Sequence, residues 1–277
     1  MSEPKIQPLS LFASGGAAAK SDPWTRIPYA DVPRFDARTV LAKWTRLQAG
    51  QGKPAQPCAD LAEGWALYHS GDFEQAAAIG LQHGPEGLAL ANRAVAIYAN
   101  YLEPREAVRL TLFRQVADRT AAQIAAEPDN CQALYWHAYS LGRYSQGISV
   151  ARALAQGLGG KVKATLERVI ALQPEHADAH VSLGVFHAEV IDKVGPLVAR
   201  MTYGARADTA VALFERGLAL NPDAPGNLME YANGLLMIYG DSRQAEAKSL
   251  FEKAAAFTPA DARERLDVEL AKAGLAD

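Results

Sequence analysis

Apolar residues recur with helical spacing from about residue 59 onward, and short polar turns interrupt this pattern. Proline occurs in four of these turns, AAEPDN at Pro128, ALQPEH at Pro174, ALNPDA at Pro222 and AFTPAD at Pro259. Proline lacks an amide hydrogen and disfavours α geometry in the residue before it, so each of these turns ends a helix. An Asp, Asn or His follows each proline and suits the start of the next helix. The pattern predicts a series of helices joined by short turns.

The helices before and after these prolines share a repeated set of residues. The apolar pairs that stand at matching offsets before the last three prolines are Val162 with Leu166, Ala210 with Phe214, and Ala247 with Phe251. The W-x2-L-G-x2-Y signature of tetratricopeptide repeats (TPRs) has four fixed positions. After Pro174, these four positions hold His180, Leu183, Gly184 and His187. The string GDFEQAA at 71–77 also matches the turn and second-helix start of that repeat. Residues 56–277 therefore resemble a divergent TPR array.

This resemblance implies an all-α, right-handed, TPR-like helical-repeat solenoid with elongated hairpins. A single hairpin cannot bury its apolar stripe, so neighbouring hairpins must stack. A small residue such as Gly184 or Ala232 allows close approach of the first helix, and a Phe or Leu of the second helix fills the space opposite. We expect one continuous apolar seam that buries Leu183, Gly184, Phe214 and Phe251.

Two apolar insertions lengthen the repeats between Pro128 and Pro222 beyond the regular length of about 34 residues. They lie near 146–160 and 190–207, between the first and second helix of successive units. Their composition is too apolar for free loops, so we expect them to lengthen the helices or to pack as a lobe at one edge. Because the units are consecutive, the two insertions should be neighbours in space. Insertions in repeats often lie on the binding face.

Two stretches at 133–147 and 164–184 are similar to two families of elongated TPR-like units. Their sequences are ALYWHAYSLGRYSQG and ATLERVIALQPEHADAHVSLG. One family is the T-component of TRAP transporters, which implies a periplasmic, ligand-handling role. The other is the regulator of microtubule dynamics family, which implies protein interaction. Cys58 lies too deep in the chain for the lipid-anchored form of the first family.

The first 55 residues are rich in Pro, Gly and Ser and show no sustained period. We interpret 1–55 as a partly extended N-terminal arm and 56–277 as the repeat domain. Trp24, Tyr29 and Phe35 within 22–35 favour burial, so this stretch could drape over the body. Residues 36–47 are compatible with a short helix capped by Asp36.

Charge and composition favour no special partner or compartment. The net charge is −3, which gives no argument for nucleic acid or anionic membrane as a partner. Cys58 and Cys131 are the only cysteines of the sequence, which suits a reducing compartment. There is no run of about 18 apolar residues, so we expect no membrane span. Residues 1–21 lack the order of a signal peptide, so we expect a cytoplasmic rather than a periplasmic protein.

Candidate chemistry is weak. His176, His180 and His187 share one side of a helix and could be metal ligands, but two of them take core positions of the repeat. An 11-residue gap also spans about 16 Å of helix, too far for one coordination sphere. The string GLGGKV near 157–162 departs from the phosphate-loop pattern. We expect no catalytic residues, no metal and no cofactor, and thus a protein that is not an enzyme.

The concave groove is the surface that TPR folds commonly use for binding. The repeat register directs toward it Trp65, Tyr68, Tyr135, Tyr139, Arg143, Val181, Val185, Met229 and Asn233. Aromatic residues, Arg and Met are enriched at interface cores, so we expect a binding or adaptor protein that holds a protein or peptide segment. The alternative is a small organic ligand closed in by the insertions, as in the TRAP T-component. In either case residues 22–35 could cover part of the groove.

Overall fold

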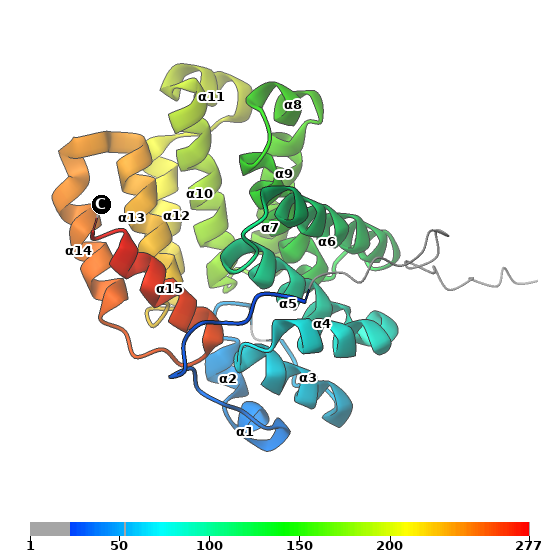
Figure 1. Cartoon of the computed structure of the whole chain (residues 1–277). Helices are drawn as coiled ribbons and strands as arrows, with labels where there is room; N and C mark the ends of the chain where they lie inside the picture. The colour runs from blue at the N-terminus through cyan, green and yellow to red at the C-terminus, as the bar shows by residue number, and fades with distance from the viewer. Residues whose placement is uncertain (1–22, 53, 277) are drawn as a thin grey trace, which may run out of the picture.

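The computed structural model describes residues 23–52 and 54–276, and all regular structure within them is helical (Figure 1). The first part of the chain forms α1 (Ala37–Ala42), α2 (Trp44–Leu47), α3 (Ala59–His69), α4 (Phe73–Gln82), η1 (Gly84–Gly87), α5 (Leu88–Tyr101), α6 (Glu106–Ala126) and α7 (Cys131–Gln146). The second part forms α8 (Val150–Ala155), α9 (Leu158–Leu172), α10 (Ala177–Val194), α11 (Pro196–Tyr203), α12 (Ala207–Leu220), α13 (Pro225–Tyr239), η2 (Gly240–Arg243), α14 (Gln244–Ala255) and α15 (Ala262–Ala273).

The helices pair into hairpins that stack on one another. The hairpins are α3 with α4, α5 with α6, α7 with α9, α10 with α12, and α13 with α14, and α15 packs on the last of them. Figure 1 shows that the array curves until α15 lies close to α2 and α3, and α15 contacts α3 directly. The predicted all-α helical-repeat solenoid is confirmed.

Residues before the repeated prolines leave the helix in the way that proline requires. Gln173 has φ −136° and ψ 82°, and Asn221 has φ −139° and ψ 81°. Both values lie outside α geometry, because the ring of the following proline would clash with a helical residue before it. Helices α9 and α12 therefore end one residue earlier, as the sequence predicts.

Polar residues after three of the prolines cap the next helix. Asn130 and Asp261 accept hydrogen bonds from backbone amides three residues later, at 3.0 and 2.9 Å. His176 does the same through Nδ1, which accepts from the Ala179 amide at 3.2 Å. Helix α13 differs, since it begins with Pro225 at its first position, where no amide hydrogen is needed.

Phe214 of α12 is the centre of the second core cluster. Its ring is fully buried, and a Cβ placed on Gly184 of α10 or on Gly234 of α13 would meet it at 3.0 or 2.5 Å. The two glycines therefore let the first helices of two successive hairpins approach the same phenylalanine. Leu183 and Phe251 are also buried, each 5% exposed. The four residues are buried as predicted, but Leu183 belongs to the larger core cluster and Phe214 and Phe251 to the second one, so the single continuous seam is not formed.

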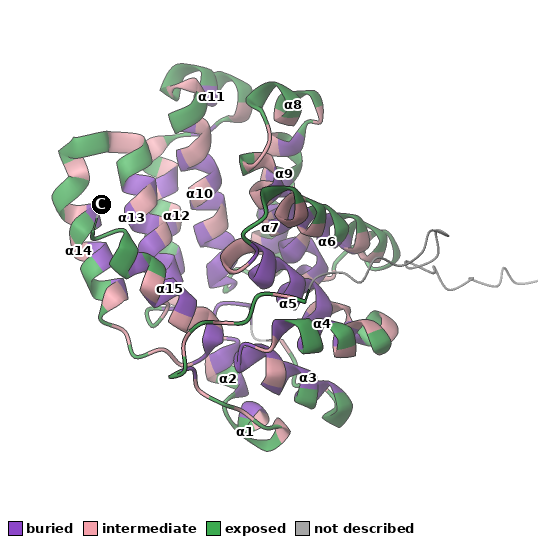
Figure 2. Cartoon of the chain, in the orientation of Figure 1, coloured by how far each residue is buried: buried purple, intermediate pink, exposed green. Residues whose placement is uncertain are grey.

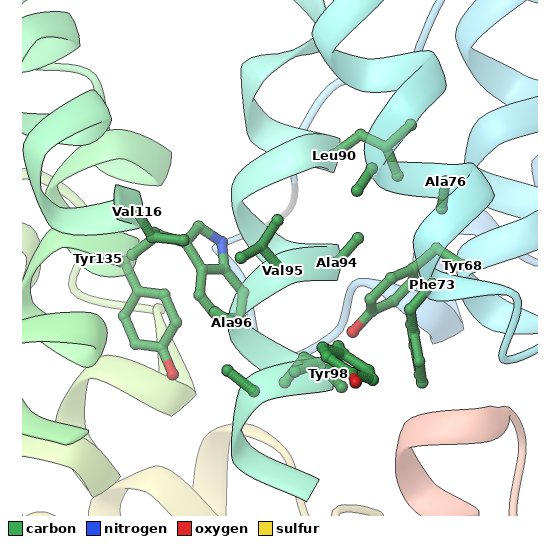
Figure 3. Packing of buried hydrophobic residues seen from close by; sticks show 14 of the residues in the cluster. Tyr68, Phe73, Ala76, Leu90, Ala94, Val95, Ala96, Tyr98, Val116 and Tyr135 are labelled. Atoms are coloured by element: carbon green, nitrogen blue, oxygen red, sulfur yellow. The ribbon is translucent and has the colours of Figure 1, made fainter. Parts of the chain in front are cut away.

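Helix α5 is enclosed on both sides in the larger core cluster. Every residue from Leu90 to Ala99 is buried. Figure 3 shows Leu90 and Ala94 on the side of Ala76 and Tyr68, while Val95 lies toward Val116 and Tyr135. Alanines in every turn keep α5 narrow, so bulky side chains from both neighbouring hairpins fit against it.

The two insertions both lengthen helices and add short ones. Helices α7 and α10 have 16 and 18 residues, and α8 and α11 follow them. Figure 1 shows α8 and α11 at the same end of the solenoid. Tyr203 at the end of α11 lies so close to Gly159, at the start of α9, that an added Cβ would meet the ring at 2.9 Å. The insertions are neighbours in space, as predicted.

The N-terminal segment lies along the body. Residues 23–35 contain no helix; Trp24 stacks on Tyr98 with ring centroids 4.0 Å apart, and Arg265 lies 4.2 Å from the centre of the Tyr29 ring. Asp36 caps α1 with a capping box, as predicted. Val40 and Trp44 belong to the same core cluster as the repeats. The division of the chain at residue 55 stays a prediction, and residues 1–21, where we expect no signal peptide, lie outside the described residues.

Candidate functional site

The concave side of the solenoid contains a cavity of about 150 Å³ between α7, α9, α10 and α13. Its walls are mainly apolar and include Val162, Leu166 and Phe186. Val150 and Leu154 of α8 line the cavity and are also 44% and 49% exposed, so it reaches the surface beside that helix. The insertions thus form its outer rim.

The structure brings six of the nine candidate groove residues to this cavity. They are Tyr135, Tyr139, Arg143, Val181, Val185 and Met229. They come together at the cavity because α7, α10 and α13 are all first helices of hairpins, as the register derived from the prolines assigns them.

Trp65, Tyr68 and Asn233 do not line the cavity. Trp65 is 6% exposed and packs edge-on against Trp44 of α2, with centroids 5.3 Å apart. Tyr68 is fully buried, and its hydroxyl accepts a hydrogen bond from Arg93 Nε at 3.0 Å. Asn233 is half-buried on α13. The N-terminal residues around Trp44 cover the face of α3 that the repeat register assigns to the groove.

An ion pair between α10 and α15 forms the floor of the cavity. Arg263 Nη1 lies 3.2 Å from Asp178 Oδ2, which also accepts a hydrogen bond from Gln51 Nε2 at 2.6 Å. Burial alone would raise the pKa of Asp178, but the charge of Arg263 and the hydrogen bond from Gln51 lower it. Asp178 is therefore a carboxylate, and its charge is matched inside the floor.

Two polar groups at the floor have an unused hydrogen-bonding atom among the described residues. Asn227, which is 4% exposed, has no hydrogen-bond partner for Nδ2; Arg263 Nε also makes no hydrogen bond, but it lies 3.9 Å from Asp267 Oδ2 in an ion pair. Both residues line the cavity. A buried donor without an acceptor costs free energy, about 1–3 kcal/mol, which an acceptor on a bound molecule would recover.

The side wall contains a second ion pair. Arg143 Nη2 donates to Glu230 Oε1 at 2.6 Å, and the guanidinium lies 5.3 Å from the centre of the Tyr139 ring. Burial raises the pKa of the Tyr139 hydroxyl, so it stays protonated and can donate. Arg143 is thus already paired with Glu230, so it forms part of the wall and does not present an unpaired charge to the cavity.

Residues 46–51 close the inner end of the concave surface. Gln132 donates to the Gln51 carbonyl at 3.1 Å, and the Asp178 amide donates to the Gly50 carbonyl at 3.0 Å. A second hollow of about 40 Å³ lies among Arg46, Gly50 and Asp261, on the other side of the floor. Residues 23–35 do not line the cavity. From the sequence we expect residues 22–35, with their aromatic side chains, to cover part of the groove. In the structure, residues 46–51 close this end instead.

Four residues that line the cavity are absent from the set predicted from the sequence: Asp178, Asn227, Glu230 and Arg263. Asp178 and Asn227 lie one turn or less from the starts of α10 and α13, and their type resembles that of ordinary capping residues. Arg263 belongs to α15, which was not assigned to the groove. The apolar content of the insertion at 146–160 was the one signal for the rim.

The three histidines considered as metal ligands take part in separate local contacts. His176 caps α10, His180 Nε2 lies 2.9 Å from the Pro174 carbonyl, and His187 Nδ1 accepts from the Arg206 amide at 3.2 Å. Within residues 23–52 and 54–276, no group of three His, Cys, Asp or Glu side chains is placed to hold a metal ion.

Comparison with known proteins supports the fold. No known family profile and no curated protein matches the sequence. The structure is similar to TTC0263, a thermophilic TPR protein of Thermus thermophilus, with a TM-score of 0.53 and 19% identity over 77% of this chain and 97% of that one. It is more loosely similar to the human IFIT1 dimer with m7Gppp-AAAA, with a TM-score of 0.43 and 18% identity over 81% of this chain and 56% of that one. The second likeness is too loose to support an argument.

The chain thus has a TPR-like helical-repeat fold, as its repeated residues predict. The similarity to the TRAP T-component and the regulator of microtubule dynamics family stays a prediction. In the part of the chain that the structure describes, no helix is both long and apolar enough to cross a membrane.

Proposed function

We propose that this protein is a non-enzymatic binding protein that holds a short segment of a protein partner on its concave face. One apolar side chain of that segment would enter the cavity between α7 and α10. The observation that supports this most is a cavity with apolar walls, an open rim and a floor whose charges are already paired. Burial of an apolar side chain in such a site supplies affinity, and the Tyr139 hydroxyl can orient the partner's backbone.

A small organic ligand is the second candidate. The unpartnered Asn227 Nδ2 at the floor favours it, because a carbonyl or carboxylate oxygen on a compact ligand would satisfy this buried donor. A volume of about 150 Å³ also matches the cavities that hold a benzene-sized group. Both candidates use the same walls, so one variant tests them together. The proposal includes three expectations from the sequence: a cytoplasmic location, no cofactor and no nucleic-acid partner.

Gly142 offers a way to fill the cavity without disturbing the fold. It lines the cavity on α7, and a Cβ placed on it would meet nothing within 4 Å. Gly142→Phe should therefore project a ring into the site. Gly160→Phe is the matched control, since Gly160 lies on α9 outside the cavity and has equally open surroundings.

The test is selection from a random peptide library displayed on phage, with parallel native mass spectrometry of the purified protein. We expect enriched peptides with a common apolar residue that bind the unchanged protein and Gly160→Phe but not Gly142→Phe. A small molecule retained in the spectra, and lost only in Gly142→Phe, would assign the second candidate instead. Peptides that bind all three proteins equally would exclude the cavity as the site.

A further inference from the structure

Helices α8 and α11 project from one end of the solenoid and carry exposed apolar side chains. Figure 1 shows both beyond the ends of the long helices, and Figure 2 shows that most of their surface is exposed. Leu197 is 71% and Met201 80% exposed on α11, and Leu154 is 49% exposed on α8. Together with Val198 of α11, also 49% exposed, these are the most exposed large apolar residues of the described chain, and they gather on two neighbouring short helices.

These two helices, taken together with the adjoining ends of α9 and α10, carry only positive charge. Residues 147–163 and 193–206 contain six Lys or Arg residues and no Asp or Glu, whereas the whole chain has a net charge of −3. Lys163 pairs with Glu167 and Arg206 with Asp208. The remaining four, which are exposed and make no ion pair among the described residues, are Arg152, Lys161, Lys193 and Arg200.

The flanking acids lie in the long helices: Asp192 and Glu189 in α10 and Asp208 in α12. Glu189 accepts a hydrogen bond from Gln146 beside the cavity. Asp192 is adjacent to Lys193, well within the roughly 10 Å over which charges interact at moderate salt, so it offsets part of that charge. The positive charge at this end therefore comes mainly from Arg152, Lys161 and Arg200.

We propose that α8 and α11 together dock the protein on the surface of an anionic lipid bilayer. Leu154, Leu197 and Met201 would enter the boundary between headgroups and acyl chains, while the four free cations contact anionic headgroups. Projecting apolar side chains beside Lys and Arg are the combination that interfacial helices use, and neither helix is long enough to span a bilayer. Leu154 and Lys193 also line the cavity, so docking would bring the rim of the cavity to the bilayer, whatever the cavity binds.

Co-sedimentation with vesicles tests the proposal directly. The probes are phosphatidylcholine vesicles with and without phosphatidylserine. We expect binding only to the vesicles with phosphatidylserine, and a decrease of that binding as salt rises. Arg200→Glu should weaken it about tenfold, and Leu197→Ser should also weaken it. The matched controls are Arg216→Glu on α12 and Leu172→Ser on α9, which are also exposed but outside the two helices and should change nothing.

Depth of insertion gives a second measurement that a general loss of stability would not mimic. Met201→Trp should show fluorescence quenching by lipids brominated on the acyl chains when phosphatidylserine is present. Failure to bind either vesicle, or equal weakening by the controls, would overturn the proposal. Equal binding to neutral vesicles would overturn its electrostatic part. Binding of a soluble acidic amphipathic peptide without vesicle binding would assign this surface to a protein partner instead.

Discussion

The guanidinium of Arg46 and the carboxylate of Glu264 join the two ends of the helical array through hydrogen bonds of 2.7 and 3.1 Å. Arg46 lies in α2, before the first hairpin, and Glu264 lies in α15, after the last one. Arg46 also donates to the Asp223 carbonyl at 3.1 Å. The N-terminal segment thus holds the C-terminal end of the solenoid against its beginning.

Arg46→Ala should lower the free energy of unfolding by about 1 kcal/mol, because it leaves the largely buried Glu264 without its cation. Urea unfolding followed by circular dichroism measures this change. Arg114→Ala is the control, since Arg114 pairs with Asp118 on the exposed face of α6 and should contribute about 0.5 kcal/mol or less. Equal losses in the two variants would show that the bridge does not hold the ends together.

His176 should make the protein less stable in mild acid. Burial lowers the pKa of His176 to about 4 from its ordinary value of 6.5. The unfolded chain therefore binds this proton more tightly, so the contribution to stability is complete above pH 6.5 and is lost as the pH falls toward 4. The loss amounts to about 3 kcal/mol at most. His176→Asn keeps a capping side chain but cannot titrate, so its stability should fall less over this range.

The comparison must be made between variants, because other buried groups titrate nearby. Burial raises the pKa of Asp267 to about 6 from its ordinary value of 3.8. Its contribution to stability therefore has the opposite sign: it is complete below pH 3.8 and is lost as the pH rises through 6. His83→Asn, in the turn after α4, controls for the change of residue type. The assignment would be contradicted if the free energy of unfolding of His176→Asn fell between pH 6.5 and 4 as much as that of the unchanged protein.

The same substitution should have opposite effects at two glycines. Gly142→Ala adds a methyl group to a helix where nothing lies within 4 Å, and should raise stability by about 0.5–1 kcal/mol. Gly234→Ala places a Cβ 2.5 Å from the fully buried Phe214 ring, and should lower stability by about 1–3 kcal/mol. Thermal unfolding of both variants checks the signs, and a gain at Gly234 would show that Phe214 does not require the gap.

Trp24→Ala should release the segment that precedes α1. Loss of the stack on Tyr98 removes one of its anchors, and we expect a cost of about 1–2 kcal/mol. Trypsin should then cut at Arg26 and Arg34 faster, as measured by mass spectrometry over time. Pro28→Ala, an exposed position in the same segment, should leave the cleavage rate close to that of the unchanged protein.

The repeats could be predicted from the sequence because their physics is local. Proline ends a helix wherever it occurs in such a pattern, and a polar residue after it caps the next helix, as His176 does. Gly184 and Phe214 mark close helix contacts whatever the rest of the chain does. These signals also directed Tyr135, Tyr139 and Val181 to the face where they line the cavity.

The closing contacts could not be predicted, because no periodicity connects residues so far apart. Nothing in the sequence around Arg46 points to Glu264, and nothing around Gln51 points to Asp178. A contact between distant parts of the chain also explains Trp65. The register directs this residue to the groove, but Trp44 packs against it and covers it. Tertiary contacts made by the N-terminal segment decide these positions.

The Arg46–Glu264 bridge also restricts how this fold can evolve. An open repeat array tolerates duplication or deletion of a module, because each module touches only its neighbours. In this protein an extra hairpin would move α15 away from α2 and separate the bridge. The number of modules is therefore set by closure, and change should be easier within the hairpin tips than in their count.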